Sequence, residues 1–363
     1  MNRFKGKDIS GCATSGIMDK SGQRFSGRDI IDSIAVMHER SNGLGGGFAA
    51  YGIYPDRKND WCFHLMYDDI SSKEKTEERL RDNFKILKSD KIPTREKVHL
   101  KYKPLLWRYF LQSKIEKINL HYNFTEEDFL VNLILNINAQ IKGAFIFSSG
   151  KNMGVFKGVG YPEDIGNFFK LEEYAAYTWT AHGRFPTNTG GWWGGAHPFG
   201  LLDWTVIHNG EISSYGINKK FLLNYGYKCS FYTDTEVIVY LFDLLVRKHK
   251  LPFNIVANIL AAPFWKEMER KQPEEREVLE ALRIVYAGAL LNGPFSVIVA
   301  NSENMMGLND RIKLRPLVAS IQGNKLYIAS EESAIREICP HPDKTWRPKA
   351  GEPVMGKLME KNG

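Results

Sequence analysis

The sequence lacks a long hydrophobic run. Nowhere in its 363 residues do about 18 apolar residues follow one another, the length that a membrane-spanning helix needs. The first residues, MNRFKGKDISG, have no apolar stretch of the kind found in a secretory signal peptide. We therefore expect a cytoplasmic protein that does not contact a membrane. With 43% hydrophobic residues, the chain can bury one large core or two modest ones.

Cysteine is scarce, and the four cysteines are far apart, at positions 12, 62, 229 and 339. No Cys-x-x-Cys pair suggests a zinc site, a cluster or a redox dithiol. The histidines at 182, 197 and 208 show no His-Glu-x-x-His spacing and have no set of carboxylates nearby, so we expect no metal. Any cysteine chemistry would then come from one thiol acting alone.

The excess of positive over negative charge is confined to one segment. The formal net charge is +7, and residues 71–120 alone contain fourteen Lys and Arg against seven Asp and Glu, so the rest is balanced. No RNA-binding aromatic motif or zinc finger accompanies this segment, and we expect no nucleic acid partner. A solvated surface is the ordinary interpretation of such a segment, and docking to an acidic protein is the functional alternative.

Strands are predicted at both ends of the chain. Residues 9–18 and 44–54 are small and apolar without a helical period, which is typical of buried strands that lie close together. Near the C-terminal end, Gly323 and Asn324 mark a hairpin turn between two apolar segments. With helices between them, these strands predict two packed sheets covered by helices.

Two capping signals and apolar periodicity place the helices. Ser26 with Asp29 precedes one amphipathic segment, and Thr125 with Asp128 precedes another. Further helices are expected at residues 73–88, 234–248, 253–262 and 273–291. Helical and extended segments alternate from about 70 to 150, and the composition there differs from that of the flanking chain. We therefore expect an inserted α+β module at about 70–150.

The residues that could carry chemistry are densest between 181 and 236. Arg184 offers a planar fork of donors suited to a carboxylate, and Asp234 could neutralise an ammonium group. Asn209 and Gly210 place a side-chain amide beside an unobstructed backbone N–H, the two donors that an oxyanion needs. Together they predict a pocket for an α-amino acid that undergoes acyl transfer.

Each of these residues also has a purely structural interpretation. Arg184 could form a structural salt bridge, and Asn209 with Gly210 could form a hairpin turn. Asp234 could be the N-cap of the helix that follows it, in place of or in addition to its binding role.

Four ordered blocks resemble the class II glutamine amidotransferases, and within them the glutaminase domain of glutamate synthase. Residues 181–189 read AHGRFPTNT, residues 196–199 AHPF, residues 208–213 HNGEIS and residues 233–236 TDTE. A fifth block, DRIKLRP at 310–316, and the Ser-Glu pair at 330–331 also resemble family segments. The resemblance covers most of the chain and is weakest at 70–150.

The resemblance implies an N-terminal nucleophile hydrolase fold, a four-layer αββα sandwich in the α+β class with a small inserted module. Its nucleophile is an N-terminal cysteine, and the segment CATSGI, which begins at Cys12, resembles that of the family. The free α-amino group of the cysteine acts as the general base, which a peptide nitrogen cannot do. Residues 1–11 are therefore expected to be a propeptide, and residues 12–363 the amidotransferase domain.

The resemblance also assigns the substrate-binding residues. Asn209 and Gly210 would stabilise the oxyanion beside Cys12. Arg184 and Thr187 would hold the α-carboxylate of glutamine, and Asp234 its α-ammonium group. Arg40, in the segment MHERSNGLGGG, resembles the arginine of another family block.

The implied function is the glutaminase subunit of a glutamate synthase-like complex. L-Glutamine would be hydrolysed to glutamate and ammonia, and the ammonia would pass to a separate subunit that carries FMN and an iron–sulfur cluster, with no cofactor in this chain. Ala13, Pro186 and Ser213 depart from the family pattern, but none of them removes a proposed site group.

Two alternatives stay open from the sequence. One is a catalytically idle scaffold or glutamine sensor within an oxidoreductase complex, which would keep its upstream residues. The other is a papain-like hydrolase that pairs a cysteine with His182, His197 or His208.

Overall fold

Two antiparallel β-sheets form the centre of the computed structural model, which describes residues 11–98, 100–114, 124–185 and 190–359. The first sheet has the strand order β17-β15-β16-β1-β10-β3-β8. Its strands are β17 (Lys344–Trp346), β15 (Val318–Gln322), β16 (Lys325–Ala329), β1 (Ala13–Asp19), β10 (Thr178–Gly183), β3 (Gly46–Tyr51) and β8 (Met153–Gly158). Every residue of β1, β3, β8 and β10 is buried, as the apolar segments at 9–18 and 44–54 predicted for two of them.

The second sheet packs against the first. Its order is β11-β12-β13-β14-β18, and its strands are β11 (Phe199–Leu201), β12 (Trp204–Gly210), β13 (Phe295–Ala300), β14 (Asn304–Asn309) and β18 (Val354–Lys357). Gly16 of β1 allows close approach of the sheets, because a Cβ atom there would lie 3.0 Å from Met305 Sδ and 3.3 Å from Ile298 Cγ2. The two sheets therefore enclose part of the apolar core between them.

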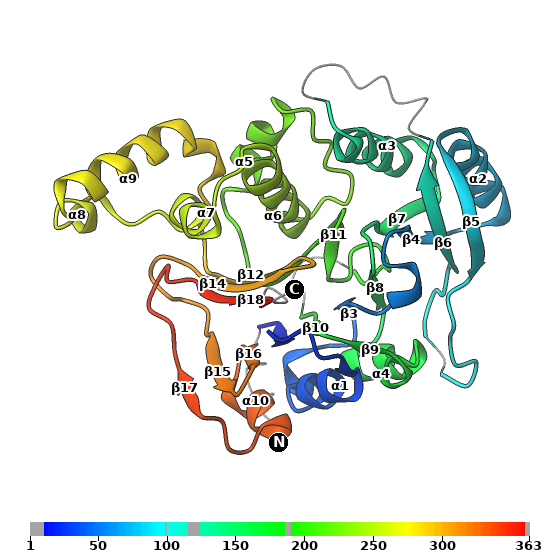
Figure 1. Ribbon diagram of the computed structural model, residues 1–363, viewed down its shortest axis with the longest axis horizontal. Coiled ribbons are helices and arrows are strands. Elements are labelled where there is room, and N and C mark those ends of the chain that lie inside the picture. The colour runs from blue at the N-terminus through cyan, green and yellow to red at the C-terminus, as the bar shows by residue number, and fades with distance from the viewer. Residues whose placement is uncertain (1–10, 99, 115–123, 186–189, 360–363) are drawn as a thin grey trace, which may run out of the picture.

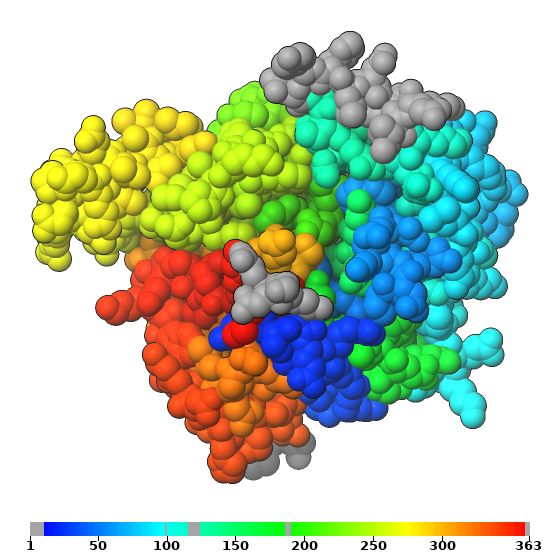
Figure 2. Space-filling model, viewed as in Figure 1, coloured from blue at the N-terminus to red at the C-terminus, as the bar shows by residue number. Residues whose placement is uncertain are grey.

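Helices cover both outer faces (Figure 1). The first sheet is covered by α1 (Arg28–Ala35), α4 (Pro162–Phe168) and α10 (Glu332–Ile338). The second is covered by α5 (Tyr215–Leu223), α6 (Asp234–Phe242), the π-helical turn η5 (Asp243–Lys248) and α7 (Phe253–Leu260). This arrangement is the expected four-layer αββα sandwich. The helices α8 (Trp265–Met268) and α9 (Pro273–Val285) project from the body (Figures 1 and 2).

A smaller sheet lies beside the sandwich. Its order is β5-β6-β4-β7, with β5 (Phe84–Lys91), β6 (Leu105–Ser113), β4 (Trp61–Tyr67) and β7 (Ala144–Ser148), and α2 (Ile70–Asn83) and α3 (Glu126–Gln140) accompany it. The module expected at about 70–150 falls on these elements. Because β4 is a central strand of the small sheet, the sheet begins at Trp61, before the expected boundary.

Short elements complete the described chain. They are β2 (Phe25–Ser26) paired with β9 (Ala175–Ala176), and the 3₁₀ turns at His38–Arg40, Pro55–Arg57, Leu171–Glu173 and Ala287–Ala289. None of the described helices has the length and apolarity required to cross a bilayer.

Some local predictions are confirmed and others are wrong. The Thr125–Asp128 capping box and the hairpin at Gly323 are present. The Ser26 cap is displaced by one residue: the N-cap of α1 is Gly27, which makes no side-chain cap, whereas Ser26 Oγ accepts from the first helical amide, Arg28 N, at 3.1 Å. The helix expected over 73–88 ends at Asn83, because the chain then enters the small sheet as β5.

Candidate active site

Cys12 lies at the entrance of β1, beside the end of β10. The adjacent residue Ala13 pairs with Gly183, and the chain after Gly183 passes directly over the thiol. The backbone N–H of Phe185 donates to Cys12 Sγ at 3.4 Å. Antiparallel pairing of two buried strands therefore brings residue 12 next to residue 185, although they are far apart in sequence.

The surroundings of Cys12 both oppose and favour ionisation. Burial raises the pKa of the thiol, and this effect exceeds the lowering by the Phe185 amide and by the guanidinium groups of Arg184, Arg315 and Arg40. A thiol with a raised pKa is a poor nucleophile until a base removes its proton. The site thus has cationic groups that favour a thiolate but still requires a general base.

Arg40 contacts the backbone of the nucleophile. Its Nε donates to the carbonyl oxygen of Cys12 at 3.3 Å, and its Nη1 pairs with Glu331 Oε1 at 2.8 Å. Its Nη2 lies 3.0 Å from the position of a Cβ on Gly11. The described contacts of Arg40 therefore orient the backbone at residues 11 and 12, and its expected contact with substrate stays a prediction.

Asn209 is the residue whose geometry most needs an explanation. It lies near the end of β12, its side chain is fully buried, and among the described residues neither its amide nitrogen nor its amide oxygen has a hydrogen-bond partner. Leaving such groups unpaired costs roughly 1–3 kcal/mol. A buried, unpaired N–H₂ group is what a preorganised oxyanion donor would present before substrate binds.

Gly210 follows Asn209 in a conformation that excludes other residues. Its φ is +139°, and a Cβ atom would lie 1.9 Å from the carbonyl oxygen of Pro294. Both residues belong to a strand, with Asn209 opposite Ser296 and Gly210 opposite Phe295. The structural interpretation of this pair as a hairpin turn is therefore wrong.

Asp234 is ionised at the first residue of α6. Burial opposes its ionisation, but His208, the Ile212 amide and the Thr235 hydroxyl together lower its pKa to about 2. Its Oδ2 accepts from Ile212 N at 3.0 Å, and its Oδ1 lies 3.6 Å from His208 Nδ1. The N-cap of α6 is Thr233, so the interpretation of Asp234 as the helix cap is wrong.

Arg184 is near enough to both Cys12 and Asp234 for their charges to act on its guanidinium group. Burial lowers the pKa of Arg184, whereas Cys12 and Asp234, which are near enough to act on it, raise it. Its backbone N–H donates to Gly45 O at 2.8 Å, and a Cβ on Gly45 would lie 3.2 Å from Arg184 Cδ. Gly45 therefore leaves room for the arginine stem. Thr187 lies outside the described residues.

The three histidines contact one another. His197 Nδ1 lies 2.8 Å from His182 Nε2, and Thr235 Oγ1 lies 2.9 Å from His197 Nε2 and 3.4 Å from His208 Nδ1. Burial lowers the pKa of His182 to about 3 and that of His197 well below its usual range.

This cluster supports neither of the chemical roles considered for it. Within the described ranges, none of the three imidazoles hydrogen-bonds Cys12, and no group of three or more potential ligands is arranged to hold a metal. The papain-like alternative therefore has no support in the geometry.

Comparison with known proteins identifies the family. The family model for class II glutamine amidotransferases matches residues 71–230, which include Arg184 and Asn209. A putative glutamine amidotransferase of Methanothermobacter thermautotrophicus is 24% identical over 90% of this chain and 93% of its own length. The segment that carries Arg184 and Asn209 therefore belongs to the class II glutamine amidotransferases.

Other relatives of the chain differ in length. An uncharacterized protein of Archaeoglobus fulgidus is 47% identical over 98% of the chain and 94% of its own length. A glutamine–fructose-6-phosphate aminotransferase of Francisella tularensis is 29% identical over 42% of the chain but only 22% of its own length. The solved glutamine PRPP amidotransferase of B. subtilis aligns with 95% of the chain and 47% of its own, with 13% identity and a TM-score of 0.47. The family match begins at residue 71, within the segment expected to match least.

The sequence analysis missed two buried ionisable side chains near the candidate site, Lys157 and Glu236. Lys157 of β8 is 1% exposed; its Nζ donates to Gly194 O at 3.0 Å and lies 4.4 Å from the ring centre of Phe199. Burial lowers its pKa to about 7, an effect that Glu236 opposes and Arg184 reinforces. The sequence feature that could have indicated this burial is a single lysine within the otherwise uncharged segment 153–158.

Glu236 orders the loop before α6. Its carboxylate accepts from the backbone amides of Ser230 and Phe231, at 2.8 and 2.9 Å, and from the Tyr240 hydroxyl. It therefore fixes the chain that leads into Asp234, a role that the TDTE block alone does not indicate.

Proposed function

We propose that this amidotransferase hydrolyses L-glutamine to glutamate and ammonia through a thioester on Cys12. The unpartnered, fully buried amide of Asn209 carries the proposal, since a group that costs stability in the resting protein is explained if it binds charge during the reaction. The family membership of the chain supports the same chemistry.

In the proposed reaction, the thiol of Cys12 attacks the side-chain carbonyl carbon of glutamine. The α-amino group of Cys12 takes the thiol proton and gives it to the departing nitrogen, so ammonia leaves and a thioester remains. The Asn209 side chain and the Gly210 N–H stabilise the oxyanion, each donor contributing about 3 kcal/mol. Water then attacks the thioester, which releases glutamate and restores the thiol.

The substrate would be held at both ends of its α-amino acid group. Arg184 with Thr187 is proposed to bind the α-carboxylate, and Asp234 the α-ammonium. Support comes from the ionised state of Asp234 and from the electrostatic influence of Cys12 and Asp234 on Arg184. Arg40 would act through the Cys12 backbone that it contacts.

The α-amino group can act as a base only if residues 1–11 are removed. The raised pKa of the thiol supports the need for this base. We therefore propose cleavage between Gly11 and Cys12, which yields a mature chain of residues 12–363. An uncleaved chain would be the idle scaffold or glutamine sensor.

The ammonia acceptor is proposed to be a glutamate synthase subunit that carries FMN and an iron–sulfur cluster. The ordered blocks at 181–236 that resemble the glutaminase domain of glutamate synthase support this partner. A cytoplasmic location stays a prediction.

Ammonia release from glutamine tests the proposed activity. Wild-type protein should release ammonia, and Cys12→Ala should release none. Cys229→Ala is the matched control, since Cys229 lies in the loop after α5 and should leave the rate unchanged. Equal rates for wild type and Cys12→Ala would contradict the proposal.

A further inference from the structure

A large cavity lies away from the proposed active site, where the small sheet meets the second sheet of the sandwich. Its volume is about 780 Å³, and its wall includes Trp61 of β4, Asp128 of α3, Asp203 and Arg247. Asp203 directly precedes β12, whereas Asn209 lies near the other end of that strand. At 3.3 Å per residue, six residues separate the cavity from the oxyanion donors by about 20 Å. A ligand there would not reach the proposed oxyanion donors Asn209 and Gly210.

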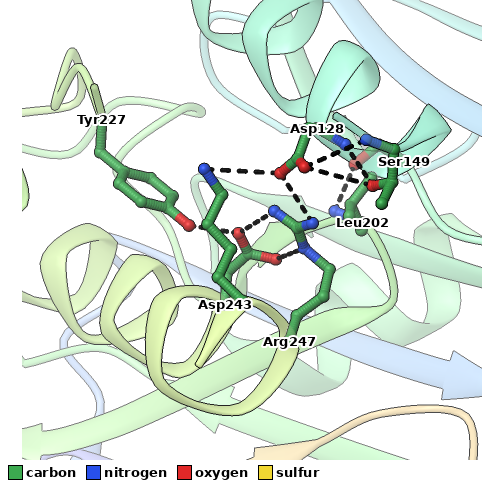
Figure 3. A network of polar contacts seen from close by, with 8 residues as sticks. Asp128, Ser149, Leu202, Tyr227, Asp243 and Arg247 are labelled. Carbon is green, nitrogen blue, oxygen red and sulfur yellow. Dashed lines mark hydrogen bonds and ion pairs between the residues drawn. The ribbon is translucent and has the colours of Figure 1, made fainter. Parts of the chain in front are cut away.

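One wall of the cavity is a network of charged side chains, and burying these charges opposes folding. Arg247 Nε donates to Asp243 Oδ1 at 2.6 Å and its Nη2 to Asp243 Oδ2 at 2.9 Å, while its Nη1 donates to Asp128 Oδ1 at 2.9 Å (Figure 3). Asp243 is fully buried and also accepts from the Tyr227 hydroxyl. Removing such charges from water costs several kcal/mol per ion, which their pairing only partly offsets.

This network fixes the guanidinium group with donors to spare. Arg247 has five N–H donors; three make the bonds to Asp243 and Asp128, and the guanidinium also lies within hydrogen-bonding reach of the Tyr227 hydroxyl. Both carboxylates of the network have partners, because Asp128 also forms an ion pair with Lys248 at 3.4 Å. The bonds to the two carboxylates therefore do not use every N–H group of Arg247, whereas both carboxylates have cationic partners.

The rest of the wall adds more cations than free acceptors. Lys151 Nζ lies 4.3 Å from the ring centre of Trp61, and neither Lys151 nor Lys250 forms an ion pair within the described ranges. The Asp203 carboxylate accepts a hydrogen bond from the Ser302 hydroxyl at 2.8 Å, and burial raises the pKa of Asp203. Glu127 is the lining carboxylate with no described hydrogen bond. The cavity is therefore rich in donors and poor in acceptors.

The backbone that supplies these cations is unusual. Arg247 and Lys248 belong to the π-helical turn η5, and Lys250 has a φ of +56°. π-Helical turns are rare and occur frequently at functional sites, and a non-glycine residue with positive φ costs of order 1–3 kcal/mol. Both irregularities fall within eight residues, at the wall of the cavity.

We propose that this cavity binds a small organic anion that carries phosphate or carboxylate groups. Surplus donors at Arg247, Lys248, Lys151 and Lys250 would bind its oxygens, as guanidinium and ammonium groups do elsewhere. The volume falls within the 300–1,000 Å³ typical of small-molecule sites and is far larger than one inorganic phosphate needs. Because the site is remote from the proposed oxyanion donors Asn209 and Gly210, the anion is not the glutamine that reacts there.

Isothermal titration calorimetry of the full chain with ATP and with citrate tests this site, and the two probes distinguish a phosphate source from a carboxylate source. Binding of either probe is expected, with an affinity at least tenfold weaker in the double variant Lys151→Ala/Lys250→Ala. Lys266→Ala, an exposed lysine of α8, is the matched control and should bind like wild type. The double variant leaves the Asp243–Arg247–Asp128 network intact, so it should fold.

The site is refuted if neither probe binds, or if the double variant binds as tightly as wild type. A loss of affinity equal in Lys266→Ala and the double variant would also refute it, because it would show only general attraction to a basic protein. None of these results depends on glutamine hydrolysis, so the proposal stands or falls separately from that activity.

Discussion

The sulfur of Cys12 lies 3.4 Å from the backbone nitrogen of Phe185, the residue after Arg184. This contact follows from the pairing of β1 with β10, in which Ala13 lies opposite Gly183. The proposed nucleophile and the proposed carboxylate holder are therefore positioned by adjacent buried strands. A site built in this way keeps its geometry without a ligand, which is the condition for preorganised catalysis.

Replacing Asn209 by alanine should abolish most activity but little stability. Loss of one oxyanion donor typically lowers kcat by about 100- to 1,000-fold. The Asn209 amide has no described hydrogen bond to lose, so the thermal midpoint should stay within a few degrees of wild type or rise. Steady-state ammonia release and thermal melts measure the two effects. A severe loss of stability with unchanged kcat in the folded fraction would show that Asn209 is structural.

Replacing Gly210 by alanine should destabilise the fold. At φ +139° the new Cβ would lie 1.9 Å from Pro294 O, so the strand pairing of β12 with β13 must shift. Gly226→Ala is the control, because Gly226 also has positive φ, +86°, but no atom lies within 4 Å of its Cβ position. We expect about 1 kcal/mol of destabilisation at Gly226 and several times more at Gly210, measured by urea unfolding. Equal losses at both positions would contradict the steric account.

Asp234→Asn should weaken glutamine binding and remove a pH-dependent contribution to stability. Since the folded pKa of Asp234 is depressed to about 2 from an ordinary value of 3.8, its ionisation stabilises the fold above about pH 4. This contribution, about 2 kcal/mol, is lost as the pH falls through 2. The variant should thus be less stable than wild type at pH 7 and equal to it near pH 2, with a raised KM at pH 7. Asp56→Asn, at an exposed carboxylate, should show neither effect.

Lys157→Met should stabilise the protein most at low pH. Because the folded pKa of Lys157 is lowered from 10.5 to about 7, the unfolded chain holds its proton through a range in which the folded chain has lost it. Wild-type stability relative to the variant should therefore rise from pH 7 to 9, by up to about 1.4 kcal/mol per pH unit. Urea unfolding at pH 6, 7, 8 and 9 measures the difference. Lys220→Met, on the exposed side of α5, should give a difference that does not change with pH.

The sequence predicted the features that depend on local pattern. The apolar segments at 9–18 and 44–54 contain buried strands, and Thr125 with Asp128 caps α3, because alternation and capping are short-range signals. Arg184, Asn209 and Asp234 could be proposed as site residues because side-chain chemistry and motif order are visible without a fold, and their roles stay predictions.

Features that depend on tertiary packing were not predictable. The N-cap of α1 is Gly27, where a Cβ would lie 2.3 Å from Leu171 O, and no local signal reports a contact between residues 27 and 171. Phe84 continues an apolar face at helical spacing, yet pairing with Ser113 of β6 places it in a strand. The burial of Lys157 likewise comes from aromatic rings distant in sequence.

The central claim is that a mature chain beginning at Cys12 hydrolyses glutamine. The most direct measurement is the intact mass and N-terminal sequence of protein purified from its native host, combined with an ammonia-release assay on the same sample. The account predicts a chain that begins at Cys12, releases ammonia from glutamine, and loses that activity in Cys12→Ser. A chain that still begins at Met1 and is inert toward glutamine would contradict it.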